Sequence, residues 1–213
     1  MISSAHLRHV MNQDSDIAKP VRLRDRLRDE ANRAILDAAE EVFSEEGLGA
    51  RMEQIATRAG VAVGTLYNHF ADREALVTAL SCSRKEALFR RLEGSLAASE
   101  GRPIRERLQG FLDAIAEHGK AHGRYLSMLV QAGEGPARAH PKQTFVKELV
   151  DRTQQVLDQA IAAGELRPEG REVYAVGLVG MIRAANVAAL EGRLTWDQLY
   201  EPLIDLFLNG ARR

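Results

Sequence analysis

Apolar residues recur every three or four positions through most of the chain, and no stretch alternates apolar and polar residues over the length of a strand. The pattern is clearest over residues 28–46, where one apolar face lies opposite a row of glutamates until Gly47 ends it. Two short helical segments follow, at 52–59 and 63–69, and Asp72 is placed to cap a longer helix. The sequence therefore predicts an all-α fold.

The rest of the chain keeps the helical period between breaks that contain glycine or proline. The helix that follows Asp72 is expected to end near residues 94–101. Further helices are expected near residues 103–118, 122–132, 141–163, 170–191 and 195–209. The chain as a whole is expected to contain a flexible polar arm over residues 1–21, a first helical domain over 22–80 and a second helical domain over 81–213.

The composition is that of a chain that buries a core: of 213 residues, 45% are hydrophobic and 28% are charged. The formal net charge of −1 excludes a uniformly basic surface, so any nucleic-acid contact has to come from the local placement of charges. A single cysteine and an N-terminus without a signal-peptide core lead us to expect a cytosolic protein. The most apolar stretch, residues 173–190, contains Arg183 and Asn186, so we expect no residence in a membrane.

The segment over residues 52–70 has the spacing of a helix-turn-helix. Ala56 is small enough for two helices to cross closely, and Gly60 can supply the positive φ of a sharp turn. Val61 fills the corner, and Ile55 and Leu66 point inward. The outward face of the second helix then carries groups suited to phosphates and base edges, namely Thr65, Tyr67 and Asn68.

The same spacing also fits a plain helical corner without a DNA-binding role. In that interpretation Tyr67 and Phe70 are core aromatic residues, and Ala56, Gly60 and Leu66 only pack the corner. Spacing alone leaves both interpretations open.

The residues themselves add a family resemblance. The chain resembles TetR-family transcriptional regulators over residues 28–80, through Ile35-Leu-x-Ala-Ala-x-x-x-Phe43-x-x-x-Gly47 followed by Ile55-Ala56-x-x-Ala59-Gly60-Val61-x-x-Gly64-Thr65-Leu66-Tyr67-x-His69-Phe70-x-x-Arg73-Glu74-x-Leu76. The resemblance implies an N-terminal three-helix helix-turn-helix domain for DNA binding, and a divergent C-terminal helical domain for ligand binding and dimerisation. It also implies that a homodimer places the helix at 63–69 in the major groove of each half of a palindromic operator.

Carried over by position, the resemblance implies that Thr65 and Asn68 contact base edges, while Tyr67 and His69 contact phosphates of double-stranded DNA. Arg73 is expected just inside a helix N-terminus, where the helix dipole disfavours a cation unless an anion such as a DNA phosphate lies nearby.

Two features depart from the family pattern. Arg51 stands where the family usually has a threonine, so we expect a phosphate contact there but no side-chain helix cap. Residues 22–80 carry eight basic against eleven acidic residues, so this domain is not basic. Four arginines precede its first helix and either grip DNA or form a solvated face: Arg22, Arg24, Arg26 and Arg28.

Other candidate chemistry is weaker. His118 and His122 have metal-ligand spacing, but interleaved glycines favour a loop and no nearby residues complete a ligand set, so we expect no metal. Cys82 is either a packed side chain or a thiol sensor. We find no catalytic constellation and no phosphate-binding loop, so we expect neither an enzyme nor a cofactor.

We expect a homodimer through residues 170–209. The small residues along 170–191 would allow close helix packing, and the aromatic residues of the last helix would complete the interface. A single buried core helix is the alternative. An unidentified, mainly apolar effector is expected to contact the helices from 103 onward, at Phe111, Ile115, Tyr125, Met128, Tyr174 and Leu178.

Arg183 and Asn186 are the polar residues of this otherwise apolar helix. They mark either the polar end of the effector pocket, a polar patch at the dimer seam, or a solvated edge that pairs with an acid nearby in the sequence. The acids that stand close in sequence are Glu191, Asp197 and Glu201.

The sequence therefore predicts a one-component transcriptional regulator, most often a repressor in this family, released from its operator by a small molecule. The alternative is a helical module without a small-molecule ligand, which acts through a protein partner or associates with DNA without sequence preference. Salt separates the two, because a specific binder keeps its preference for one palindrome at about 0.15 M salt.

Overall fold

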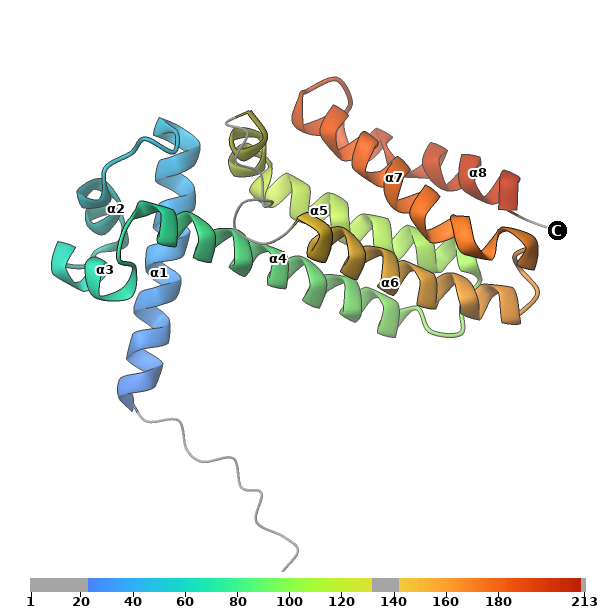
Figure 1. Cartoon of the computed structure of the whole chain (residues 1–213), viewed down its shortest axis with the longest axis horizontal. Coiled ribbons are helices and arrows are strands. Elements are labelled where there is room, and N and C mark those ends of the chain that lie inside the picture. Colours follow the sequence, from blue (N-terminus) through green and yellow to red (C-terminus); the bar gives the residue numbers. More distant parts are fainter. Residues whose placement is uncertain (1–22, 132–141, 212–213) are drawn as a thin grey trace, which may run out of the picture.

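The computed structural model describes residues 23–131 and 142–211, and every regular element within these ranges is helical (Figure 1). The all-α expectation is confirmed. In chain order the elements are α1 (Leu23–Glu46), α2 (Met52–Ala59), α3 (Val63–His69), α4 (Arg73–Ala98), α5 (Ile104–Gln131), α6 (Lys142–Ala162), the 3-10 turn η1 (Pro168–Gly170), α7 (Arg171–Leu190), the 3-10 turn η2 (Trp196–Gln198) and α8 (Tyr200–Ala211).

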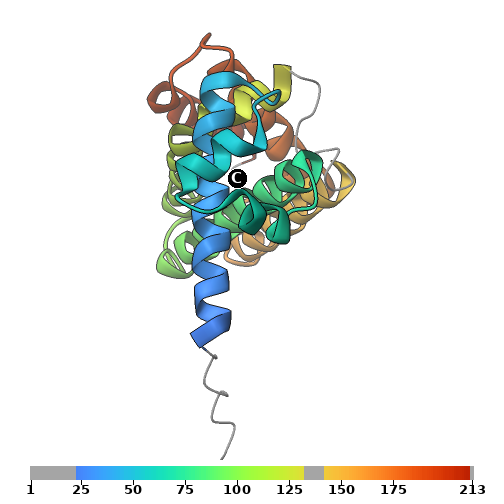
Figure 2. The same cartoon turned by 90° about the vertical axis from the view of Figure 1, so that its left-hand side faces the viewer.

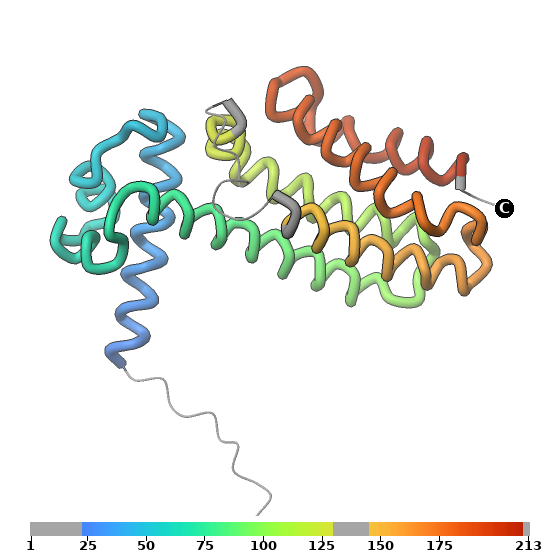
Figure 3. The backbone as a smooth tube through the Cα atoms, viewed as in Figure 1, coloured from blue at the N-terminus to red at the C-terminus, as the bar shows by residue number. Residues whose placement is uncertain are grey.

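The helices form two groups joined by α4. Figure 1 shows α1, α2 and α3 at one end and α5 to α8 at the other, with α4 running between them, and Figure 2 shows the first end face-on. The tube in Figure 3 follows α4 and α5 side by side along the molecule. Leu76 and Leu80 of α4 pack in the core of the first group, whereas Leu88 and Leu92 pack in the core of the second. The expected boundary after residue 80 thus falls inside a continuous helix.

The first core also takes residues from the second group. Tyr125 and Leu129 of α5 are fully buried, and both belong to the cluster that contains Ile35 and Phe43 of α1 and Leu66 of α3. Movement of this part of α5 would therefore disturb the packing of α1 and α3.

One expected break does not exist. The sequence predicted helices at 103–118 and 122–132, with a loop between them, but α5 is continuous from Ile104 to Gln131. Gly119 has a packing role instead of a turn role, because a Cβ atom there would lie 2.3 Å from Cη2 of Trp196. The glycine lets the indole lie directly against α5.

Two other boundaries differ from expectation. The first helix begins at Leu23, so Arg24, Arg26 and Arg28 are exposed residues of α1 and not of an arm, while Arg22 and the predicted arm over residues 1–21 lie outside the described residues. The helix predicted at 195–209 is divided into η2 and α8. Pro202 lies in the first turn of α8, where its missing N–H has no intrahelical partner to lose.

Helix α7 is apolar on two sides. Its buried side contributes Leu178, Val179 and Ile182 to the second core, and α7 packs chiefly against α6. The window Pro168–Leu190 is long and apolar enough to cross a membrane, with mean hydropathy 1.6, and 28% of it is buried. Core helices of soluble proteins meet the same criterion. The exposed side of α7 carries the apolar residues Val173 and Val176.

Candidate nucleic-acid interface and adjoining cavity

A left-handed glycine makes the corner between α2 and α3. Gly60 has φ +68° and ψ +27°, and its N–H donates to the Thr57 carbonyl at 3.2 Å while the Val61 N–H donates to the Ala56 carbonyl at 3.0 Å. This pair of bonds is the Schellman arrangement, which satisfies carbonyls at the end of α2 and turns the chain. The positive φ predicted for Gly60 is confirmed, as is full burial of the corner residues Ile55, Ala56 and Leu66.

Helix α3 is held by one residue and presents most of the others. Leu66 is its one fully buried side chain. Tyr67 is 45% exposed, Asn68 is exposed, and Thr65 and His69 are half-buried. A seven-residue helix with a single anchor gains its stability from the corner around it. Its free surface is available to another molecule.

The start of α2 is capped by Gln54 and not by Arg51. The Arg51 N–H donates to Oε1 of Gln54 at 2.8 Å, and Nε2 of Gln54 donates to Glu46 at 2.7 Å. The Arg51 side chain makes no cap bond, as predicted, because a guanidinium has no acceptor atom. The charge of Arg51 is exposed and takes no part in the cap.

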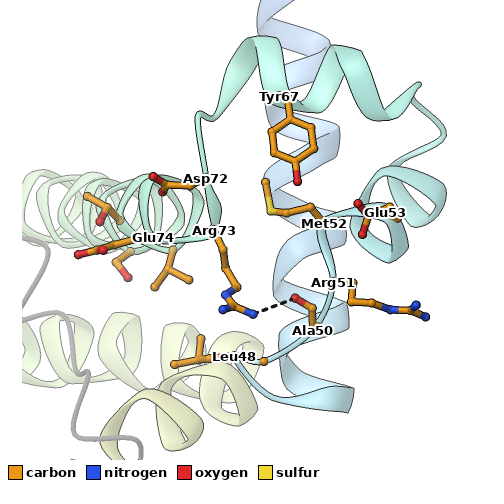
Figure 4. Close-up of a pocket in the computed structure, with 13 residues that line it drawn as sticks. Leu48, Ala50, Arg51, Met52, Glu53, Tyr67, Asp72, Arg73 and Glu74 are labelled. Atoms are coloured by element: carbon orange, nitrogen blue, oxygen red, sulfur yellow. Dashed lines mark hydrogen bonds between the residues drawn. The ribbon is translucent and has the colours of Figure 1, made fainter.

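Three candidate DNA contacts line one open groove of about 800 Å³, namely Arg51, Tyr67 and Arg73. Figure 4 shows the Tyr67 hydroxyl directed toward Met52 and the Arg73 guanidinium directed toward Ala50. Nη1 of Arg73 donates to the Ala50 carbonyl at 3.4 Å. The groove therefore brings together residues from the starts of α2 and α4 and from α3.

The N-terminus of α4 is capped as expected. Oδ1 of Asp72 accepts from the Ala75 N–H at 2.8 Å. The cap places Arg73 in the first turn of α4, where its charge opposes the helix dipole and favours a nearby anion.

Part of the acidic surface of α1 is engaged by α2. Arg58 of α2 pairs with Glu41 at 3.0 Å and with Glu45 at 2.9 Å. Among residues 23–131 and 142–211, neither Arg51 nor Arg73 pairs with a carboxylate. Glu41 and Glu45 are therefore paired with α2, whereas Arg51 and Arg73 keep unpaired charges at the groove, which Glu53, Asp72 and Glu74 also line.

The match to known proteins follows the same residues. A family model described as bacterial regulatory proteins of the tetR family matches residues 35–80. The transcriptional repressor KstR2 of Mycobacterium tuberculosis is 32% identical over 144 residues, which cover 63% of this chain and 68% of that protein. The chain belongs to the TetR family.

Other similarities agree with this assignment. The transcriptional regulator UidR of Escherichia coli is 43% identical over 53 residues, 24% of this chain and 27% of that protein. A Rhodococcus protein of unknown function has a solved structure that is similar with TM-score 0.69 and 25% identity, over 86% of this chain and 96% of that chain. KstR2 and UidR are transcriptional regulators, and this TetR-family chain is a DNA-binding regulator with α2 and α3 as its helix-turn-helix.

A second feature of this TetR-family chain is a cavity of about 180 Å³ between α4, α5 and α7. Of the predicted effector contacts, Ile115, Tyr125 and Asn186 line it. Sequence reasoning missed the other lining residues, which are Ser81, Arg84, Lys85, Leu88, His118, Gly119, Leu126, Leu129, Phe145, Leu190 and Trp196. Gly119 was missed because a loop was predicted there, whereas α5 is continuous and places His118 and Gly119 three and four positions after Ile115 on one helical face.

Five predicted contacts lie elsewhere. Phe111 and Leu178 are buried in the second core, and Tyr174 packs edge-on against Phe207 with ring centroids 5.8 Å apart. Met128 lines a separate surface groove beside Gly119 and Trp196. Arg183 is exposed and does not line this cavity.

The acids considered for Arg183 have other partners. Glu191 pairs with Arg193 at 2.6 Å, Asp197 with Lys120 at 2.6 Å and Glu201 with Arg105 at 2.8 Å. Arg183 thus stands on the open side of α7, at its solvated edge or at a dimer seam.

The cavity carries polar groups in three settings. Oγ of Ser81 and the Tyr125 hydroxyl lie 3.0 Å apart, and the Tyr200 hydroxyl donates to Oδ1 of Asn186 at 2.6 Å. Burial raises the pKa of Tyr125 to about 12, so its hydroxyl stays protonated. The His118 side chain differs from both pairs: it is 5% exposed, and its Nδ1 atom is buried with no hydrogen-bond partner among the described residues.

A charged junction adjoins the cavity. Glu40 of α1 lies 2.6 Å from Nδ1 of His122 and accepts from Nε of Arg84 at 2.6 Å, and Arg84 also pairs with Asp37 at 2.7 Å. Burial acts to raise the pKa of Glu40, but the bonds from His122 and Arg84 outweigh it and lower the pKa. The junction ties α1 to α4 and α5 through charge-assisted bonds.

The two histidines lie on α5 and not in a loop. The ring centroids of His118 and His122 are 4.6 Å apart. Within residues 23–131 and 142–211, no three His, Cys, Asp or Glu residues are grouped to hold a metal ion. Burial, with the nearby charges of His122 and Arg91, lowers the pKa of His118 to about 4, so the ring is neutral near pH 7.

Cys82 of α4 is half-buried. Burial raises the pKa of its thiol, an effect that the charge of Lys85 reduces. A raised pKa lowers the thiolate fraction, which disfavours the sensor interpretation.

Proposed function

We propose that this TetR-family regulator is a homodimeric repressor that leaves a palindromic operator when a small molecule enters the cavity between α4, α5 and α7. The observation that carries the proposal is that Tyr125 and Leu129 belong both to the cavity lining and to the first core. Both residues line the cavity, and both are fully buried in the core that supports α1 and α3. We take residues 22–80 as the DNA-binding part and residues 81–213 as the effector-binding part. A guest that binds in the effector-binding part and displaces these two side chains would change the packing of the DNA-binding part.

Each DNA-contact residue is given a role by its position. We assign Thr65 and Asn68 to base edges, because they lie on α3, whose free surface fits a major groove. We assign Arg51, Arg73 and Tyr67, together with His69, to phosphates. Support comes from the common groove and from the two arginines without carboxylate partners.

We place the dimer interface on the α7–α8 face, within the expected range 170–209. The face consists of exposed residues at helical spacing on α7 together with one residue of α8: Val173, Val176, Gly177, Gly180, Ala184, Val187 and Leu206. Val173 is 65% exposed, Val176 is 60% exposed and Leu206 is 68% exposed. A second copy of the same face would cover these side chains, and the glycines would let the two α7 helices approach closely.

The test is selection of bound fragments from the source genome, followed by release with a library of small molecules. We expect one palindrome to be enriched and to stay preferred at about 0.15 M salt, where nonspecific binding is weak. Loss of all preference at that salt would favour the nonspecific interaction module. An enriched palindrome that no small molecule releases would leave DNA recognition standing and would remove the effector.

A further inference from the structure

The cavity between α4, α5 and α7 has a mainly apolar wall and two basic residues in its lining. Leu88, Ile115 and Phe145 contribute apolar surface. Arg84 pairs with Asp37 and Glu40, and Lys85 pairs with Glu148 at 3.2 Å, but these acids lie outside the lining, which contains no Asp or Glu. Such a lining suits a guest with an apolar body and a negative group.

One atom of the lining lacks a partner. The exposed fraction of His118 is 5%, and its Nδ1 atom meets no hydrogen-bonding group among the described residues. Buried polar atoms in proteins almost always have a partner, so this nitrogen marks a place where a bound molecule would complete the site. His118 is one of the residues that line the cavity, so a guest there would contact this residue.

The charges around His118 select the sign of that partner. The charges of His122, Arg91 and Arg84 lower the pKa of the ring, and Glu40 acts in the opposite sense. Glu40 is itself bonded to His122 and Arg84. A carboxylate on the guest would accept from an Nδ1–H donor of His118 and would be favoured by this field.

The volume limits the size of the guest. A dry cavity of about 150 Å³ holds benzene, so about 180 Å³ corresponds to a single ring or a short branched chain with a small polar group. We propose that the cavity binds a compact monocarboxylic acid whose carboxylate bonds to Nδ1 of His118, with Arg84 and Lys85 as nearby cations. This inference rests on the proposed function, since it names the effector class for the same cavity.

Trp196 provides a direct readout, because it is the single tryptophan of the chain and it lines the cavity. Fluorescence titration of the full-length protein would use benzoate, its neutral isostere benzamide, cyclohexanecarboxylate and acetate. We expect saturable changes with benzoate and cyclohexanecarboxylate, at least tenfold weaker binding of benzamide, and no saturation with acetate. Equal or tighter binding of benzamide would overturn the carboxylate, and no saturation with any ring compound would overturn the site.

Two variants of one residue test the role of His118. His118→Leu removes the donor and should weaken benzoate binding at least tenfold, whereas His118→Gln keeps an N–H donor and should stay within about threefold of the natural protein. Circular dichroism checks that both variants are folded. Equal losses in the two folded variants would overturn the hydrogen bond, and the comparison of benzoate with benzamide remains decisive if neither variant folds.

Operator release separates this inference from the proposed function. Benzoate that binds beside Trp196 without releasing operator DNA would support the acid site and contradict effector-driven release. Operator release by a neutral compound, with no binding of either acid, would contradict the acid site and support the proposed function.

Discussion

Two arginines of α4 have the same side chain but different roles. Arg73 keeps a free charge at the groove, while Arg84 uses its charge to hold α1 against α4. The difference follows from what surrounds each guanidinium: Arg84 faces Asp37 and Glu40, and Arg73 faces one carbonyl, that of Ala50. Charge alone therefore does not identify the arginines that we propose to contact DNA, because the neighbouring groups decide which guanidinium stays unpaired.

The first prediction concerns phosphate contacts. Arg73→Ala should weaken binding to the operator and to unrelated DNA by the same factor, because a phosphate contact carries no sequence information. The slope of log affinity against log salt should become shallower by about 0.9, because the variant neutralises one phosphate fewer. Filter binding across a salt series measures both quantities.

The matched control is Arg102→Ala, which removes an exposed arginine that pairs with Glu106 away from α3. It should change neither the affinity nor the slope. A shift in the preferred base sequence by Arg73→Ala would contradict the phosphate role. Asn68→Ala, in contrast, should change base preference at one operator position.

The second prediction is a pH dependence of stability from His118. Its pKa is about 4 in the folded protein and near 6.5 in the unfolded chain, so between these values the unfolded chain binds more protons. The stability is fully present above about pH 6.5 and is lost as the pH falls toward 4. The shift corresponds to roughly 3 kcal/mol at its full extent, from about 1.4 kcal/mol per unit.

Urea unfolding between pH 5 and 7.5 would measure this dependence. His118→Leu should flatten the curve between pH 5 and 6.5, because the variant has no ring to protonate. Glu40, whose pKa is lowered from 4.5, loses its contribution mainly below this range and does not obscure the result. An unchanged slope in His118→Leu would mean that the ring titrates normally in the folded protein.

At the scale of elements, helix identity was predictable and helix continuity was not. Gly60 and Gly119 were both predicted to lie at breaks between helices. Gly60 does end α2, with a positive φ, whereas Gly119 lies inside α5. The difference at Gly119 comes from Trp196, which is remote in sequence and packs within contact distance of the helix. Local periodicity contains no information about such a partner, so the pocket residues of α5 were predicted only in part.

The helix-turn-helix was predicted well for the opposite reason. Its corner is specified by neighbouring residues, with Ala56, Gly60 and Leu66 all inside one short segment. Local sequence does not predict the direction of Arg183 in the same way. Whether a polar residue of an apolar helix is buried or exposed depends on where the other helices pack, and Arg183 is exposed.

The third prediction compares two glycines of α5. Gly119→Ala should displace the Trp196 indole and destabilise the protein by about 1–3 kcal/mol, as overpacking usually does. Gly123→Ala is the matched control, because its Cβ would lie 3.9 Å from Leu190, an ordinary contact. It should leave stability unchanged or raise it by up to about 1 kcal/mol through helix propensity.

Thermal unfolding and the emission of Trp196 report both effects. A red shift of emission is expected for Gly119→Ala alone, because the displaced indole meets more water. Equal stability and equal emission in the two variants would contradict the packing role of Gly119.

At the scale of the whole molecule, the proposed function requires the α7–α8 face and the groove at α3 to act together. A palindromic operator needs two copies of α3 at a fixed separation, and that separation is set wherever two chains meet. The cavity lies between these regions, with Asn186 and Leu190 of α7 on one side and Tyr125 of α5 on the other. A ligand there would contact both the helix proposed to carry the dimer and the core that supports the DNA-binding part.

The fourth prediction tests the interface with two glycines that are equivalent in the single chain. Gly180 of α7 and Gly94 of α4 are both exposed, and a Cβ at either position would meet no atom within 4 Å. If a second copy covers the α7–α8 face, Gly180→Leu forces two closely packed helices apart at a cost of about 1–3 kcal/mol, whereas Gly94→Leu adds a side chain to open solvent.

Sedimentation at micromolar concentration should then show monomers for Gly180→Leu and dimers for Gly94→Leu and the natural protein. Operator affinity should fall with dimer content, because a monomer engages one half-site. Dimeric Gly180→Leu with unchanged operator affinity would move the interface away from this face, and a membrane-bound natural protein would assign its apolar surface to lipid instead.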